Sequence, residues 1–346
     1  MVTTKSNAII IHGGGLVDPS KDVLMRLAKN LKEVYSKVFI GKYSFESLYT
    51  PSFWMEYNKE LENLVKDKRG TFFGTCRGID LTDPILSKKA INCLHEHNTT
   101  TVIVAGGDGS SRQVAEINDT FVKNGINIIF AVPLTIDGIN GGCSIGINEA
   151  VRESIRQIEN ITSTSLQTRD NEKFSVVMVE LQGRNRDDIL AETLHKIVKK
   201  GGIADFDLSE IFLRVVPANI ETNESKLVEE INNATKRTLI LVSEGAKIKI
   251  EDFAKKIKRK VRSLVVGHPS QSNNMTTQNA YDEWIDYVSC KIIAKNPLTS
   301  YCIVKWYNGL YEVFSIDYYA RLNPRNKQND QLPYDLDNLI KDYMAK

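Results

Sequence analysis

The feature that most constrains this chain is the stretch from Thr101 to Gly146, in which two apolar runs each end in a polar loop. The first run, Val102 to Ala105, leads into Gly106-Gly107-Asp108-Gly109-Ser110 and then a polar helical segment. The second, Ile128 to Val132, leads into Pro133-Leu134-Thr135-Ile136-Asp137. This order predicts a β-turn-α-β-loop unit.

Both loops of such a unit leave the carboxyl ends of parallel strands, where open α/β sheets bind ligands. We therefore expect Asp108 and Asp137 to face one crevice. Backbone N–H groups of a glycine turn at a helix N-terminus bind phosphate, and a carboxylate beside them binds Mg²⁺. The pattern predicts a phosphate and metal site with Asp108 as the metal ligand, leaving Asp137 to act as a base.

Other apolar runs predict further buried strands at Ala8 to Ile11, Val38 to Gly41, Phe174 to Leu181, Ile211 to Val216 and Thr238 to Ser243. At 346 residues, with 42% hydrophobic and 25% charged residues, the chain can bury one large core or two moderate ones. The basic run from Lys255 to Lys260 is interpreted as a solvated helix face.

The net charge is +2, from 45 basic and 43 acidic residues, so no broad basic field is expected for nucleic acid or an anionic membrane. The five cysteines contain no C-x-x-C pair, and the N-terminal apolar run is only four residues long. These features predict a cytoplasmic protein without a signal peptide or membrane span.

The GGDGS loop joined to a P-x-T-I-D loop resembles the fingerprint of the phosphofructokinase family. Further similar strings follow at Glu180-Leu181-Gln182-Gly183-Arg184, at Ser243-Glu244-Gly245-Ala246 and from Arg262 to His268. The resemblance implies an α/β fold of two Rossmann-like lobes, with parallel-rich sheets sandwiched by helices. It places a nucleotide-binding lobe at 1–146 plus 268–318 and a sugar-phosphate-binding lobe at 147–267 plus 319–346.

The implied activity is transfer of the γ-phosphoryl of Mg-ATP to the 1-hydroxyl of fructose 6-phosphate. The resemblance implies that ATP and its Mg²⁺ are held by Gly13, Gly14, Arg77, Gly107, Asp108, Gly109 and Ser110. It implies that Asp137 is the base, with Thr135, Arg77 and Arg184 completing the catalytic set. The residues implied for the sugar phosphate are Thr135, Arg169, Glu180, Gly183, Arg184, Glu244, Arg262 and His268.

These residue types suit phosphoryl transfer, which needs positioning and charge neutralisation. An arginine such as Arg77 bridges phosphoryl oxygens, and a carboxylate such as Glu244 accepts from a sugar hydroxyl. In the family, an arginine at the place of Arg169 reaches into the site of a neighbouring subunit. The resemblance thus implies a homo-oligomer, a dimer or a tetramer.

The chain departs from the family pattern on the acceptor side. The family's second loop aspartate is missing from Asp137-Gly138-Ile139-Asn140, Gln271 replaces an arginine, and Gln182 replaces a methionine. Two alternatives therefore stay open beside the leading one: a kinase of this fold with a different acceptor, and a catalytically impaired regulatory paralogue that still binds nucleotide or sugar phosphate.

On the donor side, Gln113 replaces a glycine that the family uses for close approach of adenine. Relatives that use pyrophosphate carry aspartate at the position of Gly109 and lysine at that of Leu134. This chain has neither, so ATP is the expected phosphoryl donor.

Overall fold

In the computed structural model of the protein, the described residues are 5–13, 20–68, 71–135, 144–170, 173–183, 187–218, 220–267, 285, 288, 293, 301–305 and 311–315. The chain divides into two compact units. The first comprises Met1–Gly146 and Ser272–Lys327, and the second comprises Ile147–Gln271 and Gln328–Lys346.

The first unit is built on a sheet with the strand order β16-β15-β5-β4-β1-β2-β3, with β6 paired to β5. Neighbours from β15 to β2 run parallel, while β16 and β3 are antiparallel edge strands. The central strands are nearly continuous runs of Ile and Val because both faces of the sheet are covered. The strands are β1 (Asn7–Gly13), β2 (Val38–Gly41), β3 (Trp54–Glu56), β4 (Thr99–Gly106), β5 (Asn127–Thr135), β6 (Ile145–Gly146), β15 (Tyr301–Lys305) and β16 (Tyr311–Ser315).

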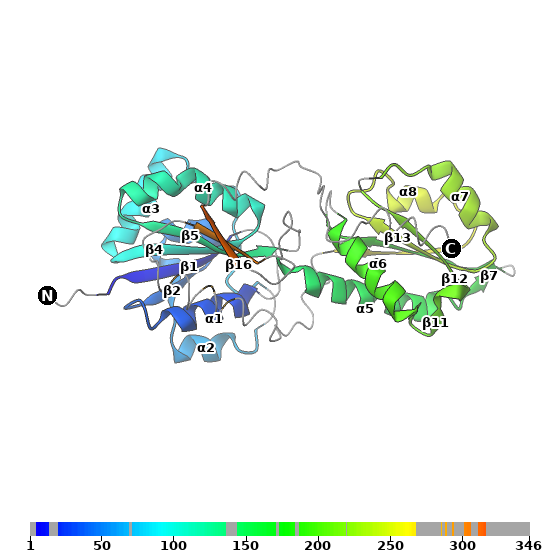
Figure 1. The fold of residues 1–346 in the computed structure, drawn as a ribbon, viewed down its shortest axis with the longest axis horizontal. Helices are drawn as coiled ribbons and strands as arrows, with labels where there is room; N and C mark the ends of the chain where they lie inside the picture. The colour runs from blue at the N-terminus through cyan, green and yellow to red at the C-terminus, as the bar shows by residue number, and fades with distance from the viewer. Residues whose placement is uncertain are drawn as a thin grey trace. The chain divides into compact units, whose positions relative to one another are not determined.

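Helices cover both faces of this sheet (Figure 1). Helices α3 (Pro84–Glu96) and α4 (Asp108–Lys123) pack on one face, in a core that includes Ile9 and Ile11. Helices α1 (Ser20–Leu31) and α2 (Lys59–Val65) lie on the other side. The 3₁₀ turns η1 (Ser44–Tyr49) and η2 (Pro51–Phe53) precede β3, and η1 packs against α3 in the first core. Because side chains alternate along a strand, Ile10 and His12 point to the face opposite α3 and α4.

The second unit contains a fully parallel sheet in the order β12-β13-β9-β14. Helices α7 (Glu224–Asn233) and α8 (Ile250–Ala254) pack with Val176 and Met178 on one face, and α5 (Ile147–Ser165) and α6 (Asp188–Lys200) cover the other. The remaining elements are β7 (Arg169–Asp170), β8 (Lys173–Phe174), β9 (Val176–Leu181), β10 (Gly202–Ile203), β11 (Phe206–Asp207), η3 (Leu208–Glu210), β12 (Ile211–Val216), β13 (Arg237–Ser243) and β14 (Val261–Val266).

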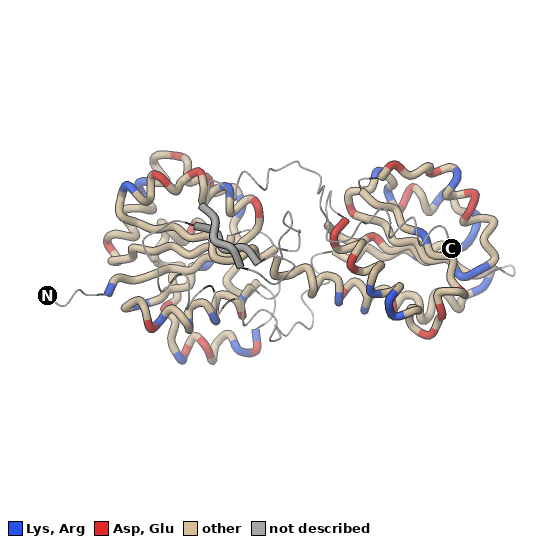
Figure 2. Tube along the Cα trace, in the orientation of Figure 1, with Lys and Arg blue, Asp and Glu red and all other residues tan. Residues whose placement is uncertain are grey.

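Both sheets are parallel-rich and covered by helices, which confirms the predicted α/β fold class. Acidic and basic residues are interspersed along the helices and loops, whereas the strands carry few of them (Figure 2). Within the described part of the chain, no helix is both long enough and apolar enough to traverse a bilayer.

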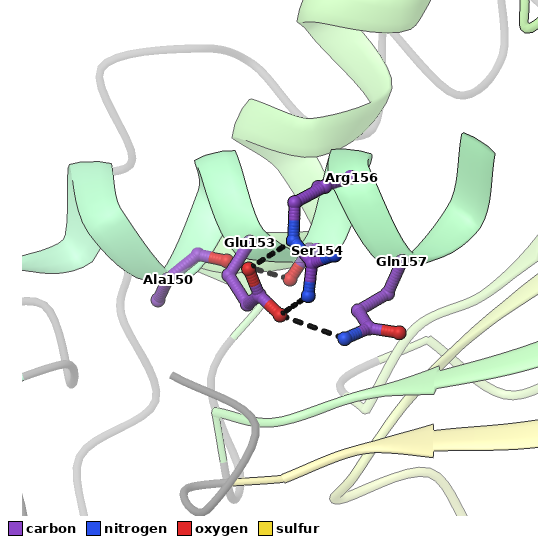
Figure 3. A network of polar contacts seen from close by, with 5 residues as sticks. All are labelled: Ala150, Glu153, Ser154, Arg156 and Gln157. Atoms are coloured by element: carbon purple, nitrogen blue, oxygen red, sulfur yellow. Dashed lines mark hydrogen bonds and ion pairs between the residues drawn. The ribbon is translucent and has the colours of Figure 1, made fainter. Parts of the chain in front are cut away.

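Helix α5 carries a buried carboxylate on its inner side (Figure 3). Glu153 is 6% exposed and accepts hydrogen bonds from Arg156 Nε and Nη2, at 2.7 and 2.5 Å, and from Gln157 Nε2 at 2.7 Å. Burial raises the pKa of Glu153, but the hydrogen bonds and the charge of Arg156 outweigh it and lower the pKa overall. The spacing of three and four residues along the helix makes these contacts local.

The interpretation of Lys255 to Lys260 as a solvated helix face is confirmed only for its four lysines, which are exposed. The helix is wrong, because α8 ends at Ala254, and Arg259 is only 7% exposed. Its guanidinium donates to the backbone carbonyls of Phe174 and Ile231, at 2.7 and 2.9 Å, and to Thr238 Oγ1 at 2.8 Å. The side chain thus ties the amino ends of β9 and β13 to α7, and this explains why a basic residue is buried there.

Candidate functional site

Two glycines meet at the carboxyl edge of the first sheet. Gly13 ends β1, Gly106 ends β4, and the two are paired in the parallel register. A Cβ on Gly106 would overlap the carbonyl oxygen of Gly13, and a Cβ on either glycine would overlap the side chain of Ser110. The absence of side chains therefore lets the two strand ends and the first turn of α4 pack together.

The N-terminus of α4 opens at this edge. Gly107 is its N-cap residue and Asp108 its first residue, so the N-cap position has no side chain that could cap the helix. By contrast, Asn58 caps α2 and Asp83 caps α3 through side-chain hydrogen bonds. An uncapped N-terminus presents backbone N–H groups and the positive end of the helix dipole, the arrangement that binds phosphate.

The second predicted loop starts beside the first. Gly106 is paired in register with Pro133, and a Cβ on Gly107 would lie 3.3 Å from Thr135 Oγ1. Thr135 is 8% exposed at the end of β5. The structure therefore brings Gly13, Gly107, Asp108, Ser110 and Thr135 to one edge, as parallel strands require.

Arg77 is exposed, on a segment attached to α4. Two residues further on, the carbonyl oxygen of Ile79 accepts a hydrogen bond from Gln113 Nε2 at 2.7 Å. Gln113, which stands where the family has a glycine, thus connects the segment of Arg77 to the helix that begins with Asp108. Gly109 is exposed, and a Cβ there would meet no atom within 4 Å.

A metal at this edge would have beside it one carboxylate from the described part of the chain, that of Asp108. Among the described residues, no group of three or more His, Cys, Asp or Glu side chains is arranged to hold a metal ion. Mg²⁺ suits such a place, because it commonly binds through one or two carboxylates together with substrate phosphates and water. The donor set around Asp108 therefore fits Mg²⁺ delivered with a phosphorylated ligand.

The second unit places three predicted residues at the carboxyl edge of its own sheet. Glu180 lies near the end of β9 and Glu244 directly after β13. The Glu244 carboxylate accepts a hydrogen bond from the Gly183 backbone N–H at 3.0 Å, and the Glu244 N–H donates to the carbonyl of Leu181 at 2.8 Å. Burial, and then the charges of Glu244 and Glu251, raise the pKa of Glu180.

Two arginines that were predicted for the sugar phosphate, and that the structure describes, lie away from that edge. Arg169 is in β7, before the amino end of β9, and its guanidinium carbon lies 5.0 Å from the Phe174 ring centroid. Arg262 is exposed on the edge strand β14, where it pairs with Val177. The four remaining predicted site residues, Gly14, Asp137, Arg184 and His268, lie outside the described residues.

Two polar residues near these edges were not among the predicted site residues. His12 precedes Gly13, is 1% exposed, and neither ring nitrogen has a hydrogen-bond partner among the described residues. Burial lowers its pKa to about 4. Gln182 precedes Gly183 and is 4% exposed, with the same lack of partners for its amide. Both residues could have been found from the sequence, because each is a polar residue at the end of an apolar strand.

Comparison with known proteins finds several relatives of low sequence identity. An ATP-dependent 6-phosphofructokinase from Spiroplasma citri is 28% identical over 219 residues, which cover 61% of this chain and 61% of that relative. One from Histophilus somni (strain 2336) is 25% identical over 231 residues, 61% of this chain and 64% of that relative. The chain thus spans less than two thirds of the length of these relatives.

Solved structures show the same fold. A T-state phosphofructokinase from Pichia pastoris matches 99% of this chain and 39% of its own, with a TM-score of 0.72 and 15% identity. A pyrophosphate-dependent phosphofructokinase from Nitrosospira multiformis matches 97% of this chain and 90% of its own, with a TM-score of 0.72 and 12% identity. The sequence model of the family described as Phosphofructokinase matches residues 7–285. Since that match covers most of the chain, the protein belongs to the phosphofructokinase family.

Proposed function

We propose that the protein is a phosphotransferase that moves the γ-phosphoryl of Mg-ATP to the 1-hydroxyl of fructose 6-phosphate. The observation that carries the proposal is the meeting of two motifs at one sheet edge. There the uncapped N-terminus of α4, with Asp108 as its first residue, stands beside Thr135. Such an edge can hold a phosphate chain and its metal next to the loop that leads to Asp137.

In this proposal the backbone N–H groups of Gly107, Asp108 and Gly109 bind donor phosphates, and Asp108 holds the metal. Ser110 lies in the same turn, where its N–H already donates to the Gly107 carbonyl at 3.0 Å. Mg²⁺, when bound, neutralises charge on the transferring phosphoryl group. Arg77 reaches phosphoryl oxygens from the neighbouring segment, and Thr135 contacts the acceptor. Asp137 accepts the proton of the attacking hydroxyl, a role that rests on the Thr135-Ile136-Asp137 motif alone.

The acceptor is held by Glu180, Gly183 and Glu244, together with Arg184 and His268. Arg262, which pairs with Val177 near the amino end of β9, lies away from these residues of its own chain. Arg169 lies before a six-residue strand whose far end carries Gly183, a span of about 20 Å. That distance exceeds the reach of an arginine side chain, which supports the assignment of Arg169 to the site of a neighbouring subunit. We therefore expect a homo-oligomer, a dimer or a tetramer.

A second candidate is a kinase of the same fold with a different acceptor. The observation that favours it is the buried amide of Gln182 at the acceptor edge, where the family has a methionine. In that case the donor chemistry would be unchanged, and only the preferred sugar phosphate would differ.

The test is a coupled phosphotransfer assay of the full chain with Mg-ATP or pyrophosphate as donor. The acceptors are fructose 6-phosphate and a panel of other sugar phosphates. We expect turnover with Mg-ATP and fructose 6-phosphate. Turnover with another acceptor alone would select the second candidate, whereas nucleotide binding without any turnover would identify an impaired paralogue.

Two substitutions separate the proposed roles. Asp137→Asn should lower kcat by about 10²-fold or more with nucleotide binding retained, because it removes the base. Asp108→Asn should raise the Mg²⁺ concentration needed for the half-maximal rate, because it removes the proposed metal ligand. Asp119→Asn, at an exposed position on the same helix, is the matched control. An unchanged rate in Asp137→Asn would remove the proposed mechanism.

A further inference from the structure

Gln182 is a buried amide at the carboxyl edge of the second sheet. It follows directly after β9, and its side chain is almost entirely removed from solvent, with 4% exposure. Neither Nε2 nor Oε1 has a hydrogen-bond partner among the residues that the structure describes. Native proteins rarely leave both ends of a buried amide unpaired, because the lost hydrogen bonds to water are not replaced.

The backbone around Gln182 holds it in place. Gly183 has a φ of +142°, which favours glycine, and its N–H is hydrogen-bonded to the Glu244 carboxylate at 3.0 Å. The carbonyl of Leu181, on the other side, accepts from the Glu244 N–H at 2.8 Å. Both neighbours of Gln182 are thus hydrogen-bonded to Glu244, the residue that follows β13. These bonds fix the backbone of Gln182 and keep its side chain in the buried position.

Two other side chains that the structure describes at this edge are carboxylates. Glu180 and Glu244 are close enough for the charge of Glu244 to raise the pKa of Glu180. Ionised carboxylates only accept hydrogen bonds, whereas a glutamine amide both donates and accepts. A hydroxyl group likewise donates and accepts, so one hydroxyl, or two neighbouring ones, can satisfy both atoms of the Gln182 amide.

We propose that Gln182 is a specificity-determining residue, whose amide hydrogen-bonds a hydroxyl of a polyhydroxylated sugar-phosphate acceptor. The inference rests on the proposed phosphotransferase function and adds a reason for selectivity within it. A site built to bond a hydroxyl discriminates strongly against an analogue that lacks the hydroxyl, since the buried polar group is then left unpaired.

The test compares wild type with Gln182→Met, which keeps the length of the side chain and removes the amide. The variant should have a melting temperature higher by about 2–4 °C in the absence of ligand, because an unpaired polar group is no longer buried. Its KM for the acceptor should rise by about 10- to 100-fold, with the KM for the phosphoryl donor unchanged. Calorimetric binding of the acceptor gives the same comparison without turnover.

Thr193→Val is the matched control. Thr193 lies on α6, is 0% exposed, and its hydroxyl has no hydrogen-bond partner in the described part of the chain. This variant should also raise the melting temperature but leave the acceptor KM as in wild type. The control thus separates relief of a buried polar group from loss of a ligand contact.

A second measurement varies the acceptor. The best acceptor found for wild type is compared with analogues that each lack one hydroxyl, and one of them should lose about 10-fold or more in kcat/KM. In Gln182→Met that difference should shrink to a factor of about two.

The outcomes are distinct. A wild-type protein that neither binds nor turns over any sugar phosphate overturns the proposed function, and the inference with it. Turnover in wild type with an unchanged acceptor KM in Gln182→Met overturns the inference alone. A lower melting temperature in that variant would show that the amide has a structural partner, and this also overturns it.

Discussion

The carbonyl oxygen of Gly13 occupies the space that a side chain on Gly106 would need. These residues are 93 positions apart in the chain, yet they are paired in the register of β1 and β4. Their contact brings the glycine turn after β1 to the uncapped N-terminus of α4. The candidate donor site therefore depends on two strand ends that lack side chains.

We predict that Gly106→Ala lowers the free energy of unfolding by about 1–3 kcal/mol or more, because the backbone of Gly13 must move. Urea denaturation measures the change. Gly109→Ala is the control, since a Cβ there meets no atom within 4 Å. It should stabilise the helix by about 0.5–1 kcal/mol. Equal stability of the two variants would contradict the close approach of the strands.

His12 should make stability depend on pH. Burial lowers its pKa from 6.5 to about 4 in the folded protein, so the unfolded chain binds the proton more readily. Above pH 6.5 this difference has no effect on stability. As the pH falls towards 4, the free energy of unfolding decreases by up to about 3 kcal/mol. His12→Val should remove that loss, measured as the difference in free energy of unfolding between pH 7.5 and pH 4.5.

A substitution of His95, which is exposed on α3, is the control for His12→Val. It should leave the pH-dependent difference in place. If His12→Val keeps the full acid sensitivity of wild type, the loss of stability must come from other groups.

Glu180→Gln should stabilise the protein at neutral pH and weaken the acceptor site. The pKa of Glu180 is raised by burial and by Glu244 and Glu251, so its ionisation disfavours folding. Below the pKa that Glu180 has in the unfolded chain, the group is protonated in both states and carries no penalty. As the pH rises through the raised pKa of the folded state, the free energy of unfolding falls. The variant's gain in melting temperature at pH 7.5 should therefore disappear at about pH 4.

In the phosphotransfer assay, Glu180→Gln should raise the acceptor KM by about tenfold, as expected when a charged hydrogen-bond acceptor becomes neutral. Glu229→Gln, exposed on α7, is the control and should change neither quantity. A gain in melting temperature that is the same at both pH values would show that ionisation is not its cause.

Arg259→Ala should lower the free energy of unfolding by about 3 kcal/mol or more. The guanidinium donates to the carbonyls of Phe174 and Ile231, and the substitution removes these donors from a partly buried place. Lys258→Ala, at an exposed position next to it, should stay within about 0.5 kcal/mol of wild type. Denaturant unfolding distinguishes the two, and a mild effect of Arg259→Ala would mean that water replaces the guanidinium.

Much of the fold could be predicted because buried parallel strands are continuous apolar runs. The predicted strands at Val38–Gly41 and Ile211–Val216 have the observed bounds. The burial of one basic residue in the run 255–260 could not be predicted, since the local charge pattern does not show which side chain is buried. Arg259 is buried because the carbonyls it satisfies come from β-strand ends and α7, some 20 to 85 residues away in sequence.

The sequence by itself determined the fold class and the family, because apolar periodicity and the loop motifs are local patterns. Which of the motif residues bind a ligand stays a prediction. Only the tertiary structure decided that Gly13 and Gly106 touch and that Gln113 reaches the Arg77 segment. It also decided that the Gln182 amide is buried with no partner in the described part of the chain. Close approach and hydrogen-bond satisfaction depend on groups that the chain brings together only when it folds.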